Sequence, residues 1–286
     1  MIEPLLSDDA FLADVESTAG SMHHLDLWWL GQSGFLAQHK RTRILLDPYL
    51  SDSLTRKYAG TNKPHVRISR RVVDPRRLRQ ISIITSTHGH TDHLDAETLA
   101  AIHEADRNDA APSHPRLVAP IAIQTLAEQR FGSELTAAMD AYESTTLDDV
   151  VVRSVPSAHP QLARDDRGRH LYLGYIIQIG PFTVYHSGDT MVFPGMQQML
   201  IEQSRGNIDV AILPINGKVD NMNGVDAAQL AHAIGAKLVV PCHYDLFEFN
   251  TADPHDLFVP ECERIGQPYR VLGLGERLSL PEPTTA

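Results

Sequence analysis

Short apolar runs interrupted by glycine or proline fill the first part of the chain. Runs of this kind, bounded by turn residues, are typical of β-strands. A further stretch, ISIITST at 81–87, is apolar enough to predict a fully buried strand. Residues 7–19 carry a mixed pattern that predicts a short polar helix or a loose arm. We therefore expect early strands at residues 25–31, 34–39, 42–48 and 81–87.

Helical and strand patterns mix along the remainder of the chain. We expect helices at 94–107, at 121–131 with a stop at Gly132, near 195–204, at 225–234 and near 254–265. Strands are expected at 116–120, 149–159, 171–180, 182–190, 208–217, 237–245, 269–273 and 277–280. Antiparallel strand pairs combined with strand–helix units predict an α/β fold, a four-layer αββα sandwich of two mixed sheets flanked by helices. We assign residues 1–24 to an N-terminal arm and 25–286 to one domain.

Composition and charge exclude several classes of protein. Hydrophobic residues make up 42% and charged residues 21%, as in ordinary globular proteins. The net charge of −11 argues against a protein that binds long nucleic acid or a membrane surface. The N-terminus has no basic, apolar signal pattern, and no run approaches the ~18 apolar residues of a membrane span. We expect a cytoplasmic location, with Cys242 and Cys262 as reduced thiols.

One segment is basic, although the chain as a whole has a negative net charge. Between Arg56 and Arg79 the chain is rich in lysine and arginine, and Asp74 is its only acid. Such a run is typical of a solvated face or of an intersubunit patch in a homo-oligomer. In an acidic protein it could also guide a small anionic substrate.

A cluster of histidines follows the buried strand at 81–87. The sequence STHGHTDHLD places His88, His90, Asp92 and His93 within six positions. His88 and His90 are two residues apart, so in an extended segment they point to the same side and can bind one ion. Asp92 and His93 come after the turn and can reach a second ion.

Three further polar residues stand at the ends of apolar strands. His159, Asp189 and His243 end the predicted strands at 149–159, 182–190 and 237–245. Strand ends can direct ligands into a common cleft. His159 and His243 can supply one ligand apiece, and Asp189 can bridge two ions through its two oxygens. Imidazole with carboxylate suits Zn, Mn or Fe, and two ions ~3.5–4 Å apart form a hydrolytic arrangement. We expect two divalent ions per chain, Zn²⁺ or Mn²⁺.

The histidine cluster resembles the H-x-H-x-D-H signature of the metallo-β-lactamase fold hydrolases. Within them, the chain is similar to the L-ascorbate-6-phosphate lactonase-like branch, over roughly residues 25–280. The segments that carry this similarity are LWWLGQSGF, LLDPYLSD, VYHSGDT, IDVAILPING and AKLVVPCHYDLFEFNTADP. The resemblance implies the αββα sandwich, a two-metal site and hydrolysis. It assigns His88, His90 and His159 to the first ion, Asp92, His93 and His243 to the second, and Asp189 to both.

Several other residues are candidates for supporting or substrate-binding roles. Asp47 is expected close to the cleft as a partner of the ligands or as a turn residue, and His186 either supports the site or lies in the core. Asn216 either contacts substrate or shapes a turn. Arg167 and Arg169 either bind a phosphate or belong to a solvated loop, and Tyr244 is a candidate hydrogen-bond donor to substrate.

These observations favour an enzyme. A hydroxide that bridges two ions would attack the carbonyl of a lactone or ester in a small, phosphorylated carbohydrate, and Asp92 would accept the proton as the intermediate collapses. A binuclear phosphodiesterase acting on cyclic nucleotides or RNA is the alternative hydrolase. A metal-dependent sensor without turnover is the third hypothesis, which the complete ligand sets disfavour.

Overall fold

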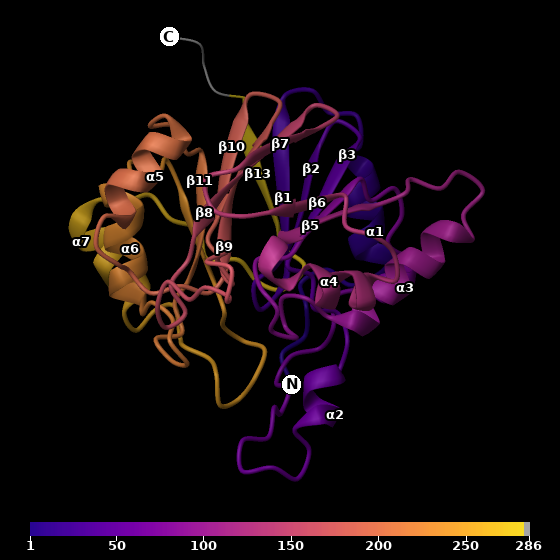
Figure 1. The fold of residues 1–286 in the computed structure, drawn as a ribbon, viewed down its shortest axis with the longest axis horizontal. Helices are drawn as coiled ribbons and strands as arrows, with labels where there is room; N and C mark the ends of the chain where they lie inside the picture. Colours follow the sequence, from indigo (N-terminus) through magenta and orange to yellow (C-terminus); the bar gives the residue numbers. More distant parts are fainter. Residues whose placement is uncertain (283–286) are drawn as a thin grey trace.

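Two β-sheets lie face to face in the computed structural model, which describes residues 1–282 (Figure 1). The first sheet has seven strands in the order β13-β1-β2-β3-β4-β5-β6, and the second has six in the order β12-β11-β10-β9-β8-β7. The bounds in the first sheet are Arg277–Pro281 (β13), His24–Gly31 (β1), Gly34–His39 (β2), Thr42–Leu46 (β3), Ile83–Thr85 (β4), Arg116–Pro120 (β5) and Ala137–Met139 (β6). Those in the second are Val239–Cys242 (β12), Val210–Pro214 (β11), Phe182–His186 (β10), Leu173–Ile179 (β9), Val150–Pro156 (β8) and Ser144–Leu147 (β7).

Helices cover the outer face of each sheet. In Figure 1, α5, α6 and α7 lie beside the six-stranded sheet, whereas α1, α3 and α4 lie beside the seven-stranded sheet. The helices are Asp8–Ser17 (α1), Ser53–Lys57 (α2), Ala96–Arg107 (α3), Gln124–Phe131 (α4), Met196–Ser204 (α5), Gly224–Ala233 (α6) and Phe258–Ile265 (α7). Short 3₁₀ turns span Pro75–Arg77 and Ile121–Ile123. The predicted four-layer α/β sandwich with two mixed sheets is confirmed. None of the helices within residues 1–282 is long and apolar enough to cross a membrane.

Strand directions explain why the candidate ligands can meet. In the second sheet β8 and β10 are each antiparallel to β9, and β10, β11 and β12 are parallel to one another. The carboxyl ends of β8, β10, β11 and β12 therefore share one edge. In the first sheet β3, β4 and β5 are parallel, so their carboxyl ends also share an edge. The loops that follow these strands carry the candidate ligands.

Four segments differ from the sequence-based expectation. No helix or strand was expected between residues 49 and 80, but this segment contains the short helix α2 and one 3₁₀ turn. The expected strand at 269–273 is reduced to a single bridge between Tyr269 and Val239, because this segment passes from β12 in one sheet to β13 in the other. Strands β6 and β7 were not expected, since both are short and the exposed positions of β7 are polar.

The N-terminal segment packs into the core. Phe11 of α1 is fully buried and meets Trp28 of β1 edge to face, with ring centroids 6.5 Å apart. The Trp28 indole N–H donates to the Asp14 carboxylate at 2.8 Å. Helix α1 is therefore part of the hydrophobic core, whereas the sequence predicted a short polar helix or a loose arm at residues 7–19 and assigned residues 1–24 to an N-terminal arm. The far end of the predicted domain, beyond residue 282, lies outside the described residues.

We predict that Phe11→Ala lowers the free energy of unfolding by about 3–5 kcal/mol, because it removes a fully buried ring from the contact with β1. Urea unfolding followed by circular dichroism measures this change. Met22→Ala, at a side chain that is 60% exposed, serves as the control. Equal and small changes in both variants would show that α1 does not support the core.

Candidate metal centre

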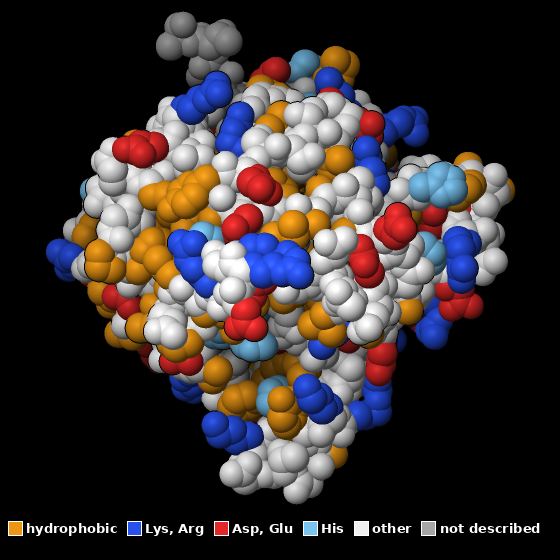
Figure 2. Space-filling view, in the orientation of Figure 1, with side chains coloured by type: hydrophobic (Ala, Val, Ile, Leu, Met, Phe, Trp, Pro, Cys, Tyr) orange, Lys and Arg blue, Asp and Glu red, His pale blue; other side chains and the backbone are white. Residues whose placement is uncertain are grey.

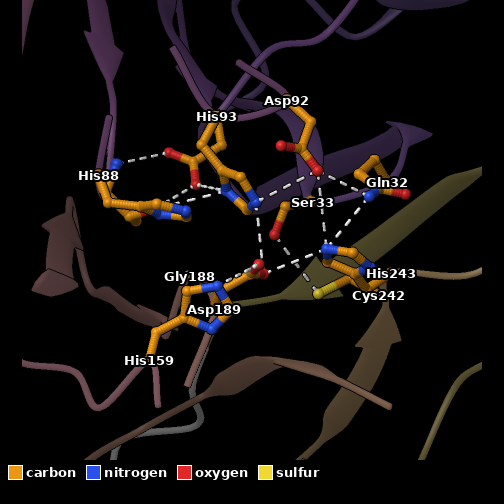
Figure 3. Close-up of polar contacts among 12 residues, drawn as sticks. Gln32, Ser33, His88, Asp92, His93, His159, Gly188, Asp189, Cys242 and His243 are labelled. Atoms are coloured by element: carbon orange, nitrogen blue, oxygen red, sulfur yellow. Dashed lines mark hydrogen bonds and ion pairs between the residues drawn. The ribbon is translucent and has the colours of Figure 1, made fainter. Parts of the chain in front are cut away.

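Seven candidate ligands form two adjacent clusters between the sheets. The first cluster contains His88, His90, His159 and Asp189, and the second contains Asp92, His93 and His243. Within each cluster the candidate ligand atoms lie within 4.8 Å of one another. Segments far apart in the sequence thus converge on one place, as Figure 3 shows for most of these side chains.

Asp189 lies between the two clusters. Its Oδ1 atom is 3.3 Å from His93 Nε2 and 3.2 Å from His243 Nε2. Its Oδ2 atom is 3.7 Å from His159 Nε2. Ligand atoms bound to one ion at ~2.0–2.2 Å lie roughly 3–4 Å apart, so these separations suit atoms that share cations. One carboxylate oxygen faces each cluster.

Outer hydrogen bonds orient three of the histidines. His93 Nδ1 lies 2.6 Å from Asp47, His159 Nδ1 donates to the Asp220 carbonyl at 2.9 Å, and His88 Nδ1 is 3.1 Å from the Thr87 hydroxyl. With Nδ1 occupied, Nε2 of each ring is the nitrogen left for the centre. Metal-binding histidines in proteins are held in this manner.

Unpartnered buried atoms test whether a cation fits. Among residues 1–282, the atoms His88 Nε2, His93 Nε2 and Asp189 Oδ1 are buried without a hydrogen-bond partner. Burying such groups without a partner costs free energy, so a missing ligand is the expected explanation. Neutral imidazole and ionised carboxylate are the ligands that Zn²⁺ and Mn²⁺ accept. The residues therefore fit divalent cations.

The electrostatics of the clusters also favour a cation. Burial lowers the pKa of His88 well below its ordinary value, which keeps this imidazole neutral. Burial acts to raise the pKa of Asp189, but His243 and His93 outweigh it and hold the pKa well below its usual range. Burial acts to lower the pKa of His93, yet Asp189 and Asp92 raise it well above its ordinary value. The second cluster thus attracts positive charge, which a proton or a metal ion can supply.

Asp47 acts on the centre through its neighbours. It is fully buried, and its carboxylate accepts from the Thr87 backbone N–H at 2.9 Å as well as pairing with His93. Of the two roles that the sequence left open, the structure favours support of a ligand. His186 is also fully buried and donates from Nε2 to the Ser33 carbonyl at 3.1 Å. It therefore holds the β1–β2 turn beside the centre.

Sequence reasoning missed Gln32, which occupies that turn. Its side-chain N–H donates to Asp92 Oδ2 at 2.9 Å, and the same nitrogen is 3.1 Å from His243 Nε2. The backbone N–H of His243 donates in turn to the Gln32 carbonyl at 3.0 Å. This contact holds His243 at a φ of 68°, a conformation that costs free energy in a non-glycine residue. The GQSG stretch of the sequence was the only available signal, and it does not indicate which residues the turn meets.

The residues predicted to bind substrate are not all brought to the centre. A cavity of about 330 Å³ borders the clusters, with His90, Asp92, His159, Asp189 and His243 among its lining residues. Asn216 lies one residue behind it, since its amide donates to Asn250 Oδ1 at 2.7 Å and Asn250 lines the cavity.

The remaining three candidates have other neighbours. Arg167 and Arg169 line a different hollow of about 680 Å³ beside residues 121–129, and Arg169 donates to Asp165 at 2.7 Å. The Tyr244 hydroxyl donates to the Leu272 carbonyl at 2.6 Å, and its ring stacks on Trp29 with centroids 4.1 Å apart. This hydroxyl is therefore engaged in the core.

Comparisons with known proteins indicate the family and the fold. Residues 42–244 match the family model described as "Beta-lactamase superfamily domain". A "UPF0173 metal-dependent hydrolase" of Opitutus terrae is 29% identical over 261 residues, which cover 89% of this chain and 99% of that protein. Another, of Thermococcus kodakarensis, is 32% identical over 231 residues, covering 80% and 88% of the two chains. The solved structure of Igni18, a metallo hydrolase from Ignicoccus hospitalis, matches with a TM-score of 0.64 at 23% identity, covering 90% of this chain and 98% of that one.

We predict that Gly188→Ala disrupts the centre. A Cβ atom at this position would lie 2.6 Å from both Cβ and Oγ1 of Thr87, and φ is +59°. The expected result is a lower free energy of unfolding, by about 1–3 kcal/mol, together with reduced metal content, because Thr87 and Asp189 must move. Gly168→Ala is the matched control, since φ there is +78° but nothing lies within 4 Å. The same loss in both variants would exclude the contact with Thr87 as the cause.

We also predict that Gln32→Leu weakens cation binding by about 10- to 100-fold, because Asp92 and His243 lose the side chain that fixes them. Competition with a chelator, followed by elemental analysis, measures the affinity. Gln178→Leu, on the exposed side of β9, is the control. Unchanged affinity in Gln32→Leu would show that this contact is incidental.

Proposed function

Because the chain belongs to the beta-lactamase superfamily, and within it to the UPF0173 metal-dependent hydrolases, we propose that it is a binuclear hydrolase that opens a lactone or related ester of a small anionic carbohydrate. One observation carries the binuclear part: Asp189 presents one oxygen to each of two clusters of ligands. The first cation would be held by His88, His90 and His159. The second would be held by Asp92, His93 and His243, with Asp189 shared.

The cations would supply Lewis acidity, lowering the pKa of a bound water toward ~7 and polarising the carbonyl under attack. The chain itself positions the proton transfers. Asp92 borders the cavity, and its Oδ2 accepts a hydrogen bond from Gln32. Burial acts to raise the pKa of Asp92, but His93, His243 and Gln32 lower it below its ordinary value. Asp92 is thus ionised at neutral pH and able to accept a proton.

The proposed reaction is the hydrolysis of one ring ester bond by one water molecule. The oxygen of water bonds to the acyl carbon, and the ring C–O bond breaks. Asp92 takes the proton from water and passes it to the departing alkoxide, which leaves a hydroxy acid. The cavity of about 330 Å³ suits a small substrate.

We predict that the protein holds about two divalent metal ions per chain after gentle reconstitution. We also predict a severe loss of turnover in Asp189→Asn. The substitution preserves shape but removes the negative charge shared by the two clusters, so kcat should fall by roughly 100-fold or more. Elemental analysis and turnover on a panel of lactones and phosphodiesters test both expectations. Circular dichroism verifies folding, and Asp256→Asn at an exposed carboxylate is the control.

Each outcome contradicts a different part of the proposal. At most one ion per chain would reject the binuclear assignment. Turnover of phosphodiesters without turnover of lactones would replace the lactonase proposal by the phosphodiesterase alternative. Near-normal activity in Asp189→Asn would remove this residue from the centre.

A further inference from the structure

A lobe formed by residues 51–70 makes the second wall of the cavity. It contains α2 and projects at the bottom of Figure 1. Leu54, Lys57, Tyr58, Lys63 and His65 line the cavity from this lobe, facing the residues of the metal centre across it. Figure 2 shows lysine and arginine side chains on both sides of histidine and apolar side chains in this region. The lobe therefore lines the cavity with basic and aromatic side chains that are separate from the metal ligands.

Most of the positive charge in the basic stretch is already neutralised. Within residues 1–282, the arginines of this stretch form ion pairs, apart from Arg71, which donates to the Leu50 carbonyl. The pairs are Arg56–Glu97, Arg67–Asp52, Arg70–Glu3, Arg76–Asp74, Arg77 with Asp8 and Asp9, and Arg79–Asp109. In the same described range, Lys57 and Lys63 have no acidic partner. They are also the lysines of this stretch that line the cavity.

An aromatic cluster holds the loop between these lysines. The His65 ring stacks on Tyr58 with centroids 4.2 Å apart, and meets Phe249 and Phe247 edge to face at 4.5 and 5.1 Å. His65 Nδ1 is 3.1 Å from the Lys63 carbonyl. The Lys57 ammonium lies 5.2 Å from the centroid of the Tyr58 ring. Packed rings thus hold the backbone that carries the two lysines, so little backbone ordering is needed when the lysines bind a ligand.

The base of the lobe is anchored to the segment that follows His243. The Ile68 N–H donates to the Leu246 carbonyl at 2.9 Å, and the Glu248 N–H donates to the Val66 carbonyl at 3.0 Å. Arg67, which pairs with Asp52 at 2.7 Å, lies over the Tyr49 ring. These bonds fix the lobe relative to a residue of the metal centre. An anion held by the lobe would accordingly stand at a set place relative to the reacting bond.

We propose that Lys57 and Lys63 form a binding site for an anionic group of the substrate, a phosphate or a carboxylate that is not itself cleaved. This inference rests on the proposed hydrolase function and names its substrate class. Two unneutralised ammonium groups beside a cavity of about 330 Å³ favour a small monoanion or dianion. In a protein of net charge −11, such a local positive region also directs an anion to this mouth. Arg167 and Arg169 line the other hollow, and Arg169 is paired with Asp165.

The test compares Lys57→Met, Lys63→Met and the double variant on three lactones that carry a phosphate, a carboxylate or no charge. We expect KM for the preferred anionic lactone to rise about 10-fold in each single variant and further in the double variant. The kcat, the metal content and the hydrolysis of the neutral lactone should stay unchanged. The two anionic lactones distinguish a phosphate from a carboxylate. Arg56→Gln is the matched control, since it removes one charge from the same helix but from a residue paired with Glu97.

A binding measurement keeps the inference independent of turnover. Calorimetric titration of the metal-loaded protein with 6-phosphogluconate and with gluconate compares two ligands that differ by one phosphate. The inference is wrong if two results are found together. In the first, lysine replacement weakens the binding of both ligands equally or of neither. In the second, KM for the anionic lactones does not rise selectively. It is also wrong if Arg167→Ala or Arg169→Ala produces the selective loss instead. Absence of lactone hydrolysis with intact, lysine-dependent anion binding would reject the proposed function and leave the anion site standing.

Discussion

The shared carboxylate of Asp189 is the contact on which the site depends. Its two oxygens face different sets of imidazoles, 3.2–3.3 Å away on one side and 3.7 Å on the other. A buried carboxylate is costly unless positive charge surrounds it, and buried imidazoles are costly unless each nitrogen has a partner. Divalent cations would satisfy both requirements at once. The fold therefore concentrates polar groups that are stabilised only in combination.

Neighbouring residues keep this arrangement in place before any ligand arrives. Asp47 reaches the centre through Thr87 and His93, and Gly188 leaves the space that the Thr87 side chain occupies. On the other side, Gln32 spans Asp92 and His243. These contacts come from both sheets, so the site and the packing of the sandwich support each other. A substitution behind the ligands should consequently affect metal binding as well as stability.

The lobe at residues 51–70 has a different relation to the fold. Its buried Leu54 packs with Tyr49, Leu246 and Phe247 in a small cluster that is separate from the main core. A surface element with its own packing can vary in sequence without disturbing the sheets. Lys57 and Lys63 of this lobe line the cavity, and within residues 1–282 neither has an acidic partner.

The sequence alone determined the α/β class, the two mixed sheets and the set of candidate ligands. These features are local: an apolar run predicts a strand, and a histidine cluster directly after it predicts ligands at the strand end. The sequence did not determine that α1 joins the core, that residues 269–273 cross between sheets, or that Gln32 meets Asp92. The sequence also predicted Arg167, Arg169 and Tyr244 as candidate substrate contacts. Only the tertiary structure decided which basic residues are paired with acids and which line the cavity. Those outcomes depend on contacts between segments that lie far apart in the sequence. Gln32 and His243, for example, are 211 residues apart, and no local pattern encodes such a contact.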